Sequence, residues 1–476
     1  WIWYYDREGC IQTTGIDFTQ DLPRLIVLLF AFQRFGLKHW GFHPDLDVLA
    51  REIHRPNLSP EFSAKMQNFL TENAIRRAPA PRNVAPATDL PIYTTVSLDG
   101  AKSVKLDFRT RRPIHQRHGL CGRATQVFSV SEILTTGLDN PPFEAERFIL
   151  KAYWPDDARV SEHQIIKAAY DACPQDPDVT NHLPFVFGSR DDAEFNTALI
   201  RTALAITPSS RGHRVLRLIV FEELYRLQDQ LTSAIGMTMT LQAIKCHYAL
   251  WVKGIHHTDI SLDNIMVRKH WMQADSTLRL SGVVNDWDLA STPASPHGSL
   301  ERTGTIPFMH PELLTTEYWE GKVPRLYLHD NSSFIWVLAF LFLRYNQGKI
   351  INALTLPLDD LLTNDYNQAR MIKKDISYRL PKFVSGLDAR KEWEVVVELL
   401  LSTSDDRDGR NLARVRARQN PEKLAELCSA DDAPGVYNAF WLVMRNAAEK
   451  NGLQYTVNMV PGMEGSSSSA AEEGGG

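Results

Sequence analysis

The sequence predicts an α+β fold in which a small sheet comes before a larger helical region. Between Tyr93 and Tyr153, β-branched residues alternate with polar ones in four short runs separated by Gly and Pro, which is typical of antiparallel strands. A further strand is predicted at Val215–Phe221. Beyond it the apolar residues recur at helical spacing, so we expect strands first and helices later.

The first 91 residues are predicted to form a helical segment that ends in a linker. The apolar stretch Leu22–Leu37 is interrupted by Arg24, Gln33 and Arg34, which is typical of an amphipathic helix and not of a signal peptide. Many aromatic residues in this segment favour packing against a neighbouring part of the chain. Residues 76–91 concentrate Pro and Ala without an apolar period, so we expect a linker there.

Composition excludes several classes of protein. The net charge of -5, without a long Lys/Arg run, argues against binding to nucleic acid or to an anionic membrane. The five cysteines form no C-x-x-C pair, so neither a disulfide framework nor a zinc site is expected, and a reducing compartment, cytoplasmic or nuclear, fits best. The longest apolar run, Phe334–Leu343, is too short to span a bilayer and predicts a buried core helix.

Two further helices and a disordered tail complete the predicted elements. Ser161–Ala172 has a capping serine and an apolar face. A second helix carries Leu241, Ile244, Tyr248 and Trp251 at helical spacing until Gly254 ends it. Residues 461–476 are Ser, Gly and Glu of low complexity that cannot bury a core, so we expect a disordered tail there.

Directly after the second helix comes HHTDISLDNIMV, in which Asp259 precedes Asn264 by five residues. Phosphoryl transfer uses a carboxylate that accepts a hydroxyl proton and an amide oxygen that binds Mg²⁺. The H-x-D-x-x-x-x-N spacing supplies both groups and favours Asp259 as a catalytic residue. The alternative is a loop that uses Asp and Asn only to make turns.

A second acidic residue, Asp286, follows the next predicted strand and precedes an aromatic residue. A carboxylate at this place binds Mg²⁺ together with the Asn in phosphotransferases of this layout, so Asn264 and Asp286 are predicted as the metal ligands. The alternative is an exposed Asp after a strand. We infer from the correct order of the two motifs that the metal-binding interpretation is the better one.

A third segment, GTIPFMHPE, runs from Gly304 to Glu312. It reproduces the G-T-x-x-aromatic-x-x-P-E pattern that forms a platform for a protein substrate. Within it, we expect Thr305 to lie near Asp259 as a structural hydroxyl. Three motifs in register are a strong signal of a phosphotransferase site.

Residues upstream are predicted to bind the nucleotide. Lys151 ends a strand-like run and is similar to the lysine that contacts nucleotide phosphates, with Glu162 on the following helix as its ion-pair partner. The alternatives are a solvated Lys and a Glu that is favoured only by the helix dipole. Gly119 and Gly122 occupy the place of the loop that covers the phosphates, although only part of the glycine pattern is present.

The sequence resembles the fungal-type protein kinase family, a divergent branch of the eukaryotic protein kinase fold. The resemblance extends to about residue 350 and includes WYYDREG, DLPRLIVLLFAFQRF, GRATQV, HTDIS, NDWDLA, RTGTIPFM and HDNSSF. It implies a bilobal kinase, with a small β-rich N-lobe at about 92–221 and a larger helical C-lobe at about 222–460. Asp330 is then similar to the buried Asp that braces the catalytic loop, and a helix cap is the alternative.

The resemblance also implies ATP and Mg²⁺ as cofactors and a Ser or Thr hydroxyl of a protein as the acceptor. Three residues depart from the family pattern: Thr258 replaces an Arg, Asp288 replaces a Gly and Ser261 replaces a Lys. None of these removes the catalytic carboxylate or the metal ligands, so we expect an active enzyme. A pseudokinase scaffold and a small-molecule phosphotransferase of the aminoglycoside or choline kinase type are the alternatives.

Overall fold

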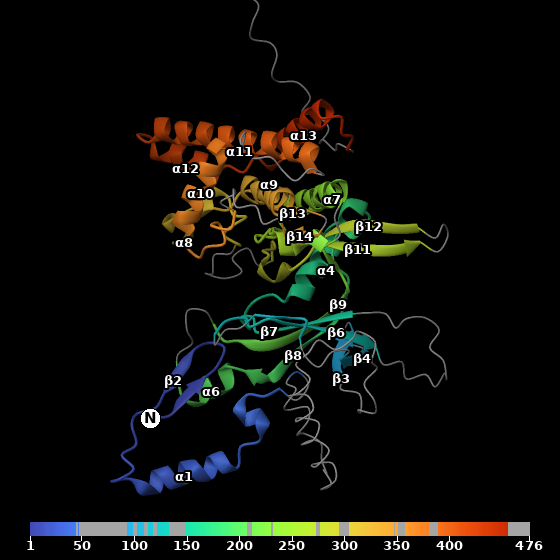
Figure 1. Ribbon diagram of the computed structural model, residues 1–476. Helices are drawn as coiled ribbons and strands as arrows, with labels where there is room; N and C mark the ends of the chain where they lie inside the picture. Colours follow the sequence, from blue (N-terminus) through green and yellow to red (C-terminus); the bar gives the residue numbers. More distant parts are fainter. Residues whose placement is uncertain are drawn as a thin grey trace, which may run out of the picture. The chain divides into compact units, whose positions relative to one another are not determined.

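The computed structural model (Figure 1) describes residues 1–43, 46, 93–98, 102–108, 113–117, 121–132, 148–206, 212–229, 232–272, 277–294, 304–346, 348–350, 358–379 and 389–455. The chain divides into two compact units. The first comprises Trp1–Ala158 and Val186–Glu222, and the second comprises Arg159–Phe185 and Glu223–Gly476. The predicted linker and the predicted tail lie outside the described residues.

The first unit is built on an antiparallel sheet of seven strands in the order β4-β3-β8-β9-β7-β6-β5. Because β4 pairs with β6 as well as with β3, the sheet closes on itself. Buried side chains such as Phe128, Leu150 and Leu218 form its core. The five predicted strands are confirmed with these bounds: β3 Tyr93–Leu98, β4 Lys102–Phe108, β6 Gln126–Glu132, β7 Phe148–Tyr153 and β9 Val215–Glu222. Two further strands, β5 His115–Gln116 and β8 Val186–Asn196, were not predicted.

The N-terminal segment of the same unit consists of a hairpin and a helix. Its elements are β1 Trp3–Tyr5, β2 Cys10–Gln12, α1 Leu22–Gln33 and the 3₁₀ turn η1 Leu37–Trp40, and a short helix, α6 Ala198–Ala203, follows β8. The predicted helix is present but ends at Gln33, where the N–H of Arg34 already bonds back to Ala31 and Phe32. None of the α1 side chains is buried, and Val27 is 69% exposed, so the packing expected of this helix is not seen among the described residues.

The second unit is mainly helical and is organised around a buried helix, α9 (Figure 1). The apolar run predicted a core helix, and α9 confirms it, since nearly all of its side chains are buried against α7, α11 and α13. None of the helices in the described ranges is long and apolar enough to span a bilayer. The helices are α4 Glu162–Ala172, α5 Pro177–Thr180, α7 Ser233–Trp251, α8 Thr316–Trp319, α9 Tyr327–Arg344, α10 Tyr366–Arg379, α11 Arg390–Ala417, α12 Pro421–Ser429 and α13 Ala433–Lys450.

Short strands and turns connect these helices and hold the loops that matter for chemistry. The hairpin β11–β12 lies beside α7, and its two strands pair with each other along their full length. The short strand β10 pairs with β11 at the edge of this sheet. The remaining elements of the unit are β10 Tyr225–Arg226, β11 Ile265–Met272, β12 Thr277–Val284, β13 Tyr345–Asn346 and β14 Lys349–Ile350, with the 3₁₀ turns η2 Leu227–Asp229, η3 Leu262–Asn264, η4 Trp287–Leu289 and η5 Pro311–Leu313.

Candidate active site

The loop after α7 returns to the core through a buried histidine. Gly254 has a φ of +77°, a left-handed conformation that glycine adopts without strain. His257 is then fully buried, with its Nε2 2.9 Å from the carbonyl oxygen of Asn285 and its ring packed against Trp287. Burial lowers the pKa of His257 to about 4, so the ring is neutral near pH 7. Its Nδ1 accepts the N–H of Asp259, so its Nε2–H donates to Asn285.

Asp259 is held by contacts to both its backbone and its side chain. Its carbonyl oxygen accepts a hydrogen bond from Asn264 Nδ2 at 2.8 Å. Its Oδ1 accepts a hydrogen bond from Thr305 Oγ1, also at 2.8 Å. The contact expected between Thr305 and Asp259 is therefore present. These two bonds fix the position of the loop and the rotamer of the carboxylate.

The hairpin β11–β12 brings the two predicted metal ligands to one place. Ile265 begins β11 and pairs with Val284, which ends β12, so the residues flanking this pair are neighbours. Asn285 accordingly donates its N–H to the carbonyl of Asn264 at 2.8 Å, and Asp286 follows in a left-handed conformation with a φ of +65°. A non-glycine residue there is strained, as is common at functional sites.

The donor atoms at this place fit a hard divalent cation. The amide nitrogen of Asn264 is used by the backbone of Asp259, so its Oδ1 is the atom left for a ligand. Together with the carboxylate of Asp286, this gives the oxygen donors that Mg²⁺ prefers. Asn264 and Asp286 could therefore hold a magnesium ion.

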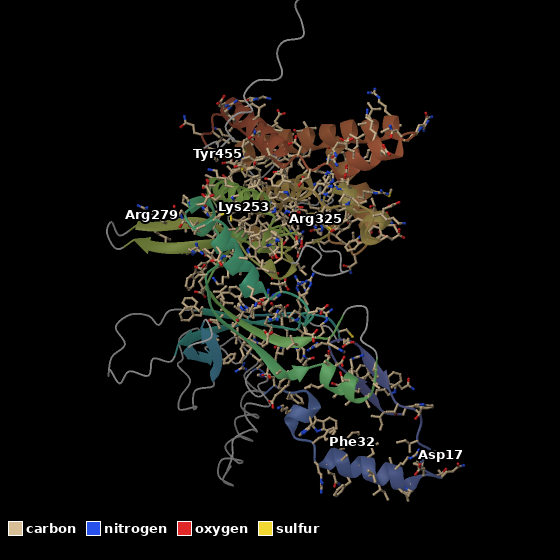
Figure 2. All side chains as sticks on the ribbon, turned by 180° about the vertical axis from the view of Figure 1, so that it is seen from behind. Asp17, Phe32, Lys253, Arg279, Arg325 and Tyr455 are labelled. Carbon is tan, nitrogen blue, oxygen red and sulfur yellow. The ribbon has the colours of Figure 1, made fainter. Side chains whose placement is uncertain are left out.

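Asp330 lies fully buried in the first turn of α9 and contacts the loop that contains Thr258 and Asp259. Its Oδ1 accepts from Arg325 Nε at 2.7 Å, and its Oδ2 lies 3.0 Å from His247 Nε2 and 3.3 Å from the N–H of Thr258. Figure 2 shows Arg325 within the helical unit. Burial alone would raise the pKa of Asp330, but Arg325 and His247 lower it well below its usual range. The helix-cap alternative is wrong, because the N-cap of α9 is Leu326.

Glu162 contacts the segment that follows Asp286. It opens α4 directly after the cap residue Ser161 and is only 1% exposed. Its Oε1 accepts the backbone N–H of Trp287 at 3.0 Å. The helix dipole alone would not require a buried glutamate, so this specific hydrogen bond adds a positional role to the dipole interaction.

The predicted nucleotide-binding residues Lys151 and Gly122 lie in the first unit, whereas Glu162 lies in the second. Lys151 sits on β7 opposite Val127 of β6, and its Nζ lies 4.7 Å from the centroid of the Tyr153 ring. Gly122 lies in the connection between β5 and β6 with a φ of +89°, a conformation that favours glycine. Gly119 lies outside the described residues.

Glu312 ends the predicted platform and is surrounded by positive and neutral donors. Its Oε2 lies 3.1 Å from Arg414 Nη2 and 3.3 Å from His329 Nε2. Glu312, His310 and His329 offer metal-ligand atoms that lie within 4.8 Å of one another. However, His329 Nδ1 accepts the N–H of Leu326, so its Nε2 carries the proton and donates to Glu312. We therefore interpret this cluster as a structural anchor of the platform.

A family model described as fungal protein kinase matches residues 1–342, which is more than half of the chain. This chain belongs to the fungal protein kinase family. The match includes the N-terminal segment and every motif from Lys151 to Asp330. The comparison with curated proteins found no match.

Two solved structures are similar to this chain at low sequence identity. The structure of vaccinia related kinase 3 is 14% identical, with 66% of this chain and 85% of that chain covered and a TM-score of 0.38. A crystal structure of another kinase domain is also 14% identical, with 60% and 73% covered and a TM-score of 0.30.

The three departures from the family pattern each occupy a defined place in this kinase. Thr258 has a φ of +65° and donates from its Oγ1 to the carbonyl of Leu289 at 3.0 Å. Asp288 is buried in η4, where its carbonyl accepts from Arg159 Nη1 at 3.3 Å. Ser261 is buried and caps η3. The segment after Asp286 is thus bonded to the loop that contains Asp259 through Thr258, and to the residues before α4 through Arg159.

Sequence reasoning missed two residues that this kinase uses to hold Asp330. His247 lies on the apolar face of α7, three residues after Ile244 and four before Trp251. A histidine on a buried stripe was the available signal, because a buried polar group needs a partner. Arg325 lies in the connection before α9, and no periodicity marks it.

Proposed function

We propose that this chain is an ATP-dependent protein kinase that transfers the γ-phosphoryl group of ATP to a Ser or Thr hydroxyl. The observation that carries the proposal is the set of contacts around Asp259, whose carbonyl bonds Asn264 and whose carboxylate bonds Thr305. A general base must be held in one orientation to accept a proton in the transition state, and these contacts supply that orientation.

The residues have separate tasks in this mechanism. Asp259 orients the acceptor hydroxyl and accepts its proton, while Thr305 holds the carboxylate and Asn264 holds the loop. Lys151 and Gly122 would contact the nucleotide phosphates. A magnesium ion, when bound by Asn264 and Asp286, would neutralise charge on the phosphate oxygens.

Two alternatives predict different behaviour. A pseudokinase scaffold would bind nucleotide without turnover. A small-molecule phosphotransferase would share Asp259, Asn264 and Asp286. The anchored segment from Gly304 to Glu312, with its hydroxyl contact to Asp259, favours a protein substrate.

The test is magnesium-dependent ATP turnover by the purified chain with three acceptor sets: a mixed library of Ser/Thr peptides, the same library with Tyr acceptors, and aminoglycosides with choline. Phosphate incorporation into the Ser/Thr library alone is the expected result. Incorporation into the small molecules would support the small-molecule alternative. Absence of transfer to every acceptor, with ATP still bound, would support the pseudokinase.

A further inference from the structure

The N-terminal hairpin β1–β2 carries a turn that is rigid by its own contacts. Asp6 accepts the N–H groups of Glu8 and Gly9 on its Oδ1, both at 2.9 Å, and donates its own N–H to the Gly9 carbonyl at 3.0 Å. The acidic side chains of the turn are nearly or fully buried, at 6% for Asp6 and 0% for Glu8. Buried carboxylates require hydrogen-bond or ion-pair partners, so these two side chains must contact donors elsewhere in the chain.

Arg201 of α6 is the main partner of this turn. Its Nε and Nη2 donate to the two carboxylate oxygens of Asp6 at 3.0 and 2.8 Å, which is a bidentate arrangement. Its Nε also lies 3.1 Å from Glu8 Oε2. The same Glu8 oxygen accepts from Thr197 Oγ1 and contacts His213 Nδ1, each at 3.0 Å. The hairpin is therefore bound to α6 and to the residues that flank this helix by buried, charge-assisted bonds.

The same turn reaches the connection between β5 and β6. The carbonyl oxygen of Arg7 accepts the N–H of Gly122 at 2.8 Å. Two residues later, Ala124 has a φ of +41°, a strained conformation for a residue with a side chain. Strain of this kind persists only where neighbouring contacts impose the conformation, and the bond to Arg7 is one such contact.

The other side of this connection is tied to the strand that carries Lys151. The carbonyl oxygen of Arg123 accepts the N–H of Trp154 at 2.8 Å, directly after β7. Residues 121–124 are thus held between the N-terminal hairpin and the end of β7. Both contacts lie within the first unit, so the arrangement belongs to one compact body.

We propose that the β1–β2 hairpin is a built-in clasp that holds residues 121–124 in the conformation that receives the nucleotide phosphates. Asp6, Glu8 and Arg201 are then positioning residues for ATP binding, which act through the Arg7 carbonyl and Gly122. This inference rests on the proposed function, because it assigns a nucleotide to the loop. It gives the N-terminal segment a role in affinity for ATP and none in the proton transfer at Asp259.

The test compares Arg201→Ala and Arg201→Lys with wild type, and uses Lys38→Ala as a control. The control removes an ion pair with Glu194 in the same unit, and neither residue of this pair bonds Asp6, Glu8 or Arg201 in the contacts described above. We expect Arg201→Ala to raise the Kd for ATP by about tenfold, with a smaller rise in Arg201→Lys, which keeps the charge but loses the bidentate geometry. The control should bind ATP as wild type does, and kcat at saturating ATP should change by less than about twofold in all three.

Hydrogen exchange of the peptide containing residues 121–124 gives a second readout that needs neither turnover nor ATP. Faster exchange of the Gly122 amide in both Arg201 variants is expected, because its acceptor is released. The clasp would be contradicted if the Arg201 variants kept the wild-type ATP affinity and the wild-type exchange rate of Gly122. This holds whether or not their melting temperature falls. Wild type that binds ATP without transferring phosphate would contradict the proposed function while leaving both clasp readouts interpretable.

Discussion

Two loops of this kinase are held in strained conformations, and they are held in different ways. The catalytic loop, with Thr258 in a left-handed conformation, is braced from inside the helical unit by the fully buried Asp330. The loop at Gly122 is braced by a hairpin from the N-terminus, through a backbone hydrogen bond from Gly122 to Arg7. Under the proposed function, the comparison predicts that the geometry for chemistry is coupled to the stability of the second unit, whereas the geometry for nucleotide binding depends on the β1–β2 hairpin.

The largest expected effect comes from replacing the proposed catalytic carboxylate of Asp259, which lies in the loop that Asp330 braces. Asp259→Asn should lower phosphoryl transfer by about 10² to 10⁴-fold, because the amide cannot accept the hydroxyl proton. ATP affinity should remain nearly unchanged, since Asp259 acts on the acceptor. The measurement is initial rate and ATP Kd on the same preparation, and near-normal turnover would show that the catalytic loop is misassigned.

Removing the internal brace should cost stability as well as activity. Asp330→Asn leaves the buried guanidinium of Arg325 without its anionic partner, and breaking a buried pair in this way costs about 3–5 kcal/mol. The free energy of unfolding from urea titration is the measurement. Glu320→Gln, which removes the exposed pair with Lys322, is the control and should leave that free energy nearly unchanged. Equal effects of both variants would refute the internal brace.

Low pH should lower the unfolding free energy of the second unit through the contact between His329 and Glu312. Burial lowers the pKa of His329, and His329 with Arg414 lowers that of Glu312 against the effect of burial. Both folded-state pKa values lie below their unfolded values, so this stability is complete above about pH 6.5 and is lost as pH falls through the folded values. Unfolding free energies at pH 7.5, 6.0 and 5.0 should therefore decrease in that order. A tenfold difference in proton affinity between the folded and unfolded protein corresponds to about 1.4 kcal/mol.

The histidine provides the control for this pH dependence. His329→Gln removes one titrating ring, so it should reduce the decrease in unfolding free energy between pH 7.5 and 5.0, and other buried histidines such as His257 should account for the remainder. An unchanged slope in that variant would contradict the assignment of the acid sensitivity to this anchor.

Metal binding gives a smaller and more specific effect. Asp286→Ala should abolish the extra rise in melting temperature that Mg²⁺ adds to ATP, because one of the two oxygen ligands is gone. ATP without Mg²⁺ should still raise the melting temperature weakly. If Mg²⁺ adds the same rise to mutant and wild type, Asp286 is not a ligand.

Much of the catalytic loop could be predicted from sequence because its residues are close together in the chain. The spacing from Asp259 to Asn264 and the strand before Asp286 are local features, and the hairpin β11–β12 turns them into neighbours. Thr305 was predicted from its place in a motif, and its contact with Asp259 is present. Local pattern and tertiary structure agree here because one hairpin and one buried helix do most of the positioning.

The braces could not be predicted because their partners are distant in sequence and unmarked by periodicity. Arg325 and His247 meet only on Asp330 in the fold. Likewise, the turn at Asp6 and its partner Arg201 are far apart in the sequence, and short polar segments carry no period that would reveal their contact. The extent of α1 was overestimated because apolar composition continues past Gln33, whereas the helix ends there.

The smallest effect is expected where related kinases are often controlled, at the phosphorylation state of the segment after Asp286. An Arg beside the catalytic Asp commonly pairs with a phosphate that orders this segment. Here Thr258 takes that place and bonds the carbonyl of Leu289, so the segment is tied to the catalytic loop without a phosphate.

The most direct test of an active site assembled by the unmodified chain is the activity of dephosphorylated protein. The purified chain is treated with phosphatase, loss of phosphate is verified by mass spectrometry, and initial rates on Ser/Thr peptides are compared with those of the untreated sample, with Asp259→Asn as the background. We predict magnesium-dependent transfer well above that background and within about tenfold of the untreated rate. A fall of about tenfold or more, equivalent to roughly 1.4 kcal/mol in barrier height, would contradict it.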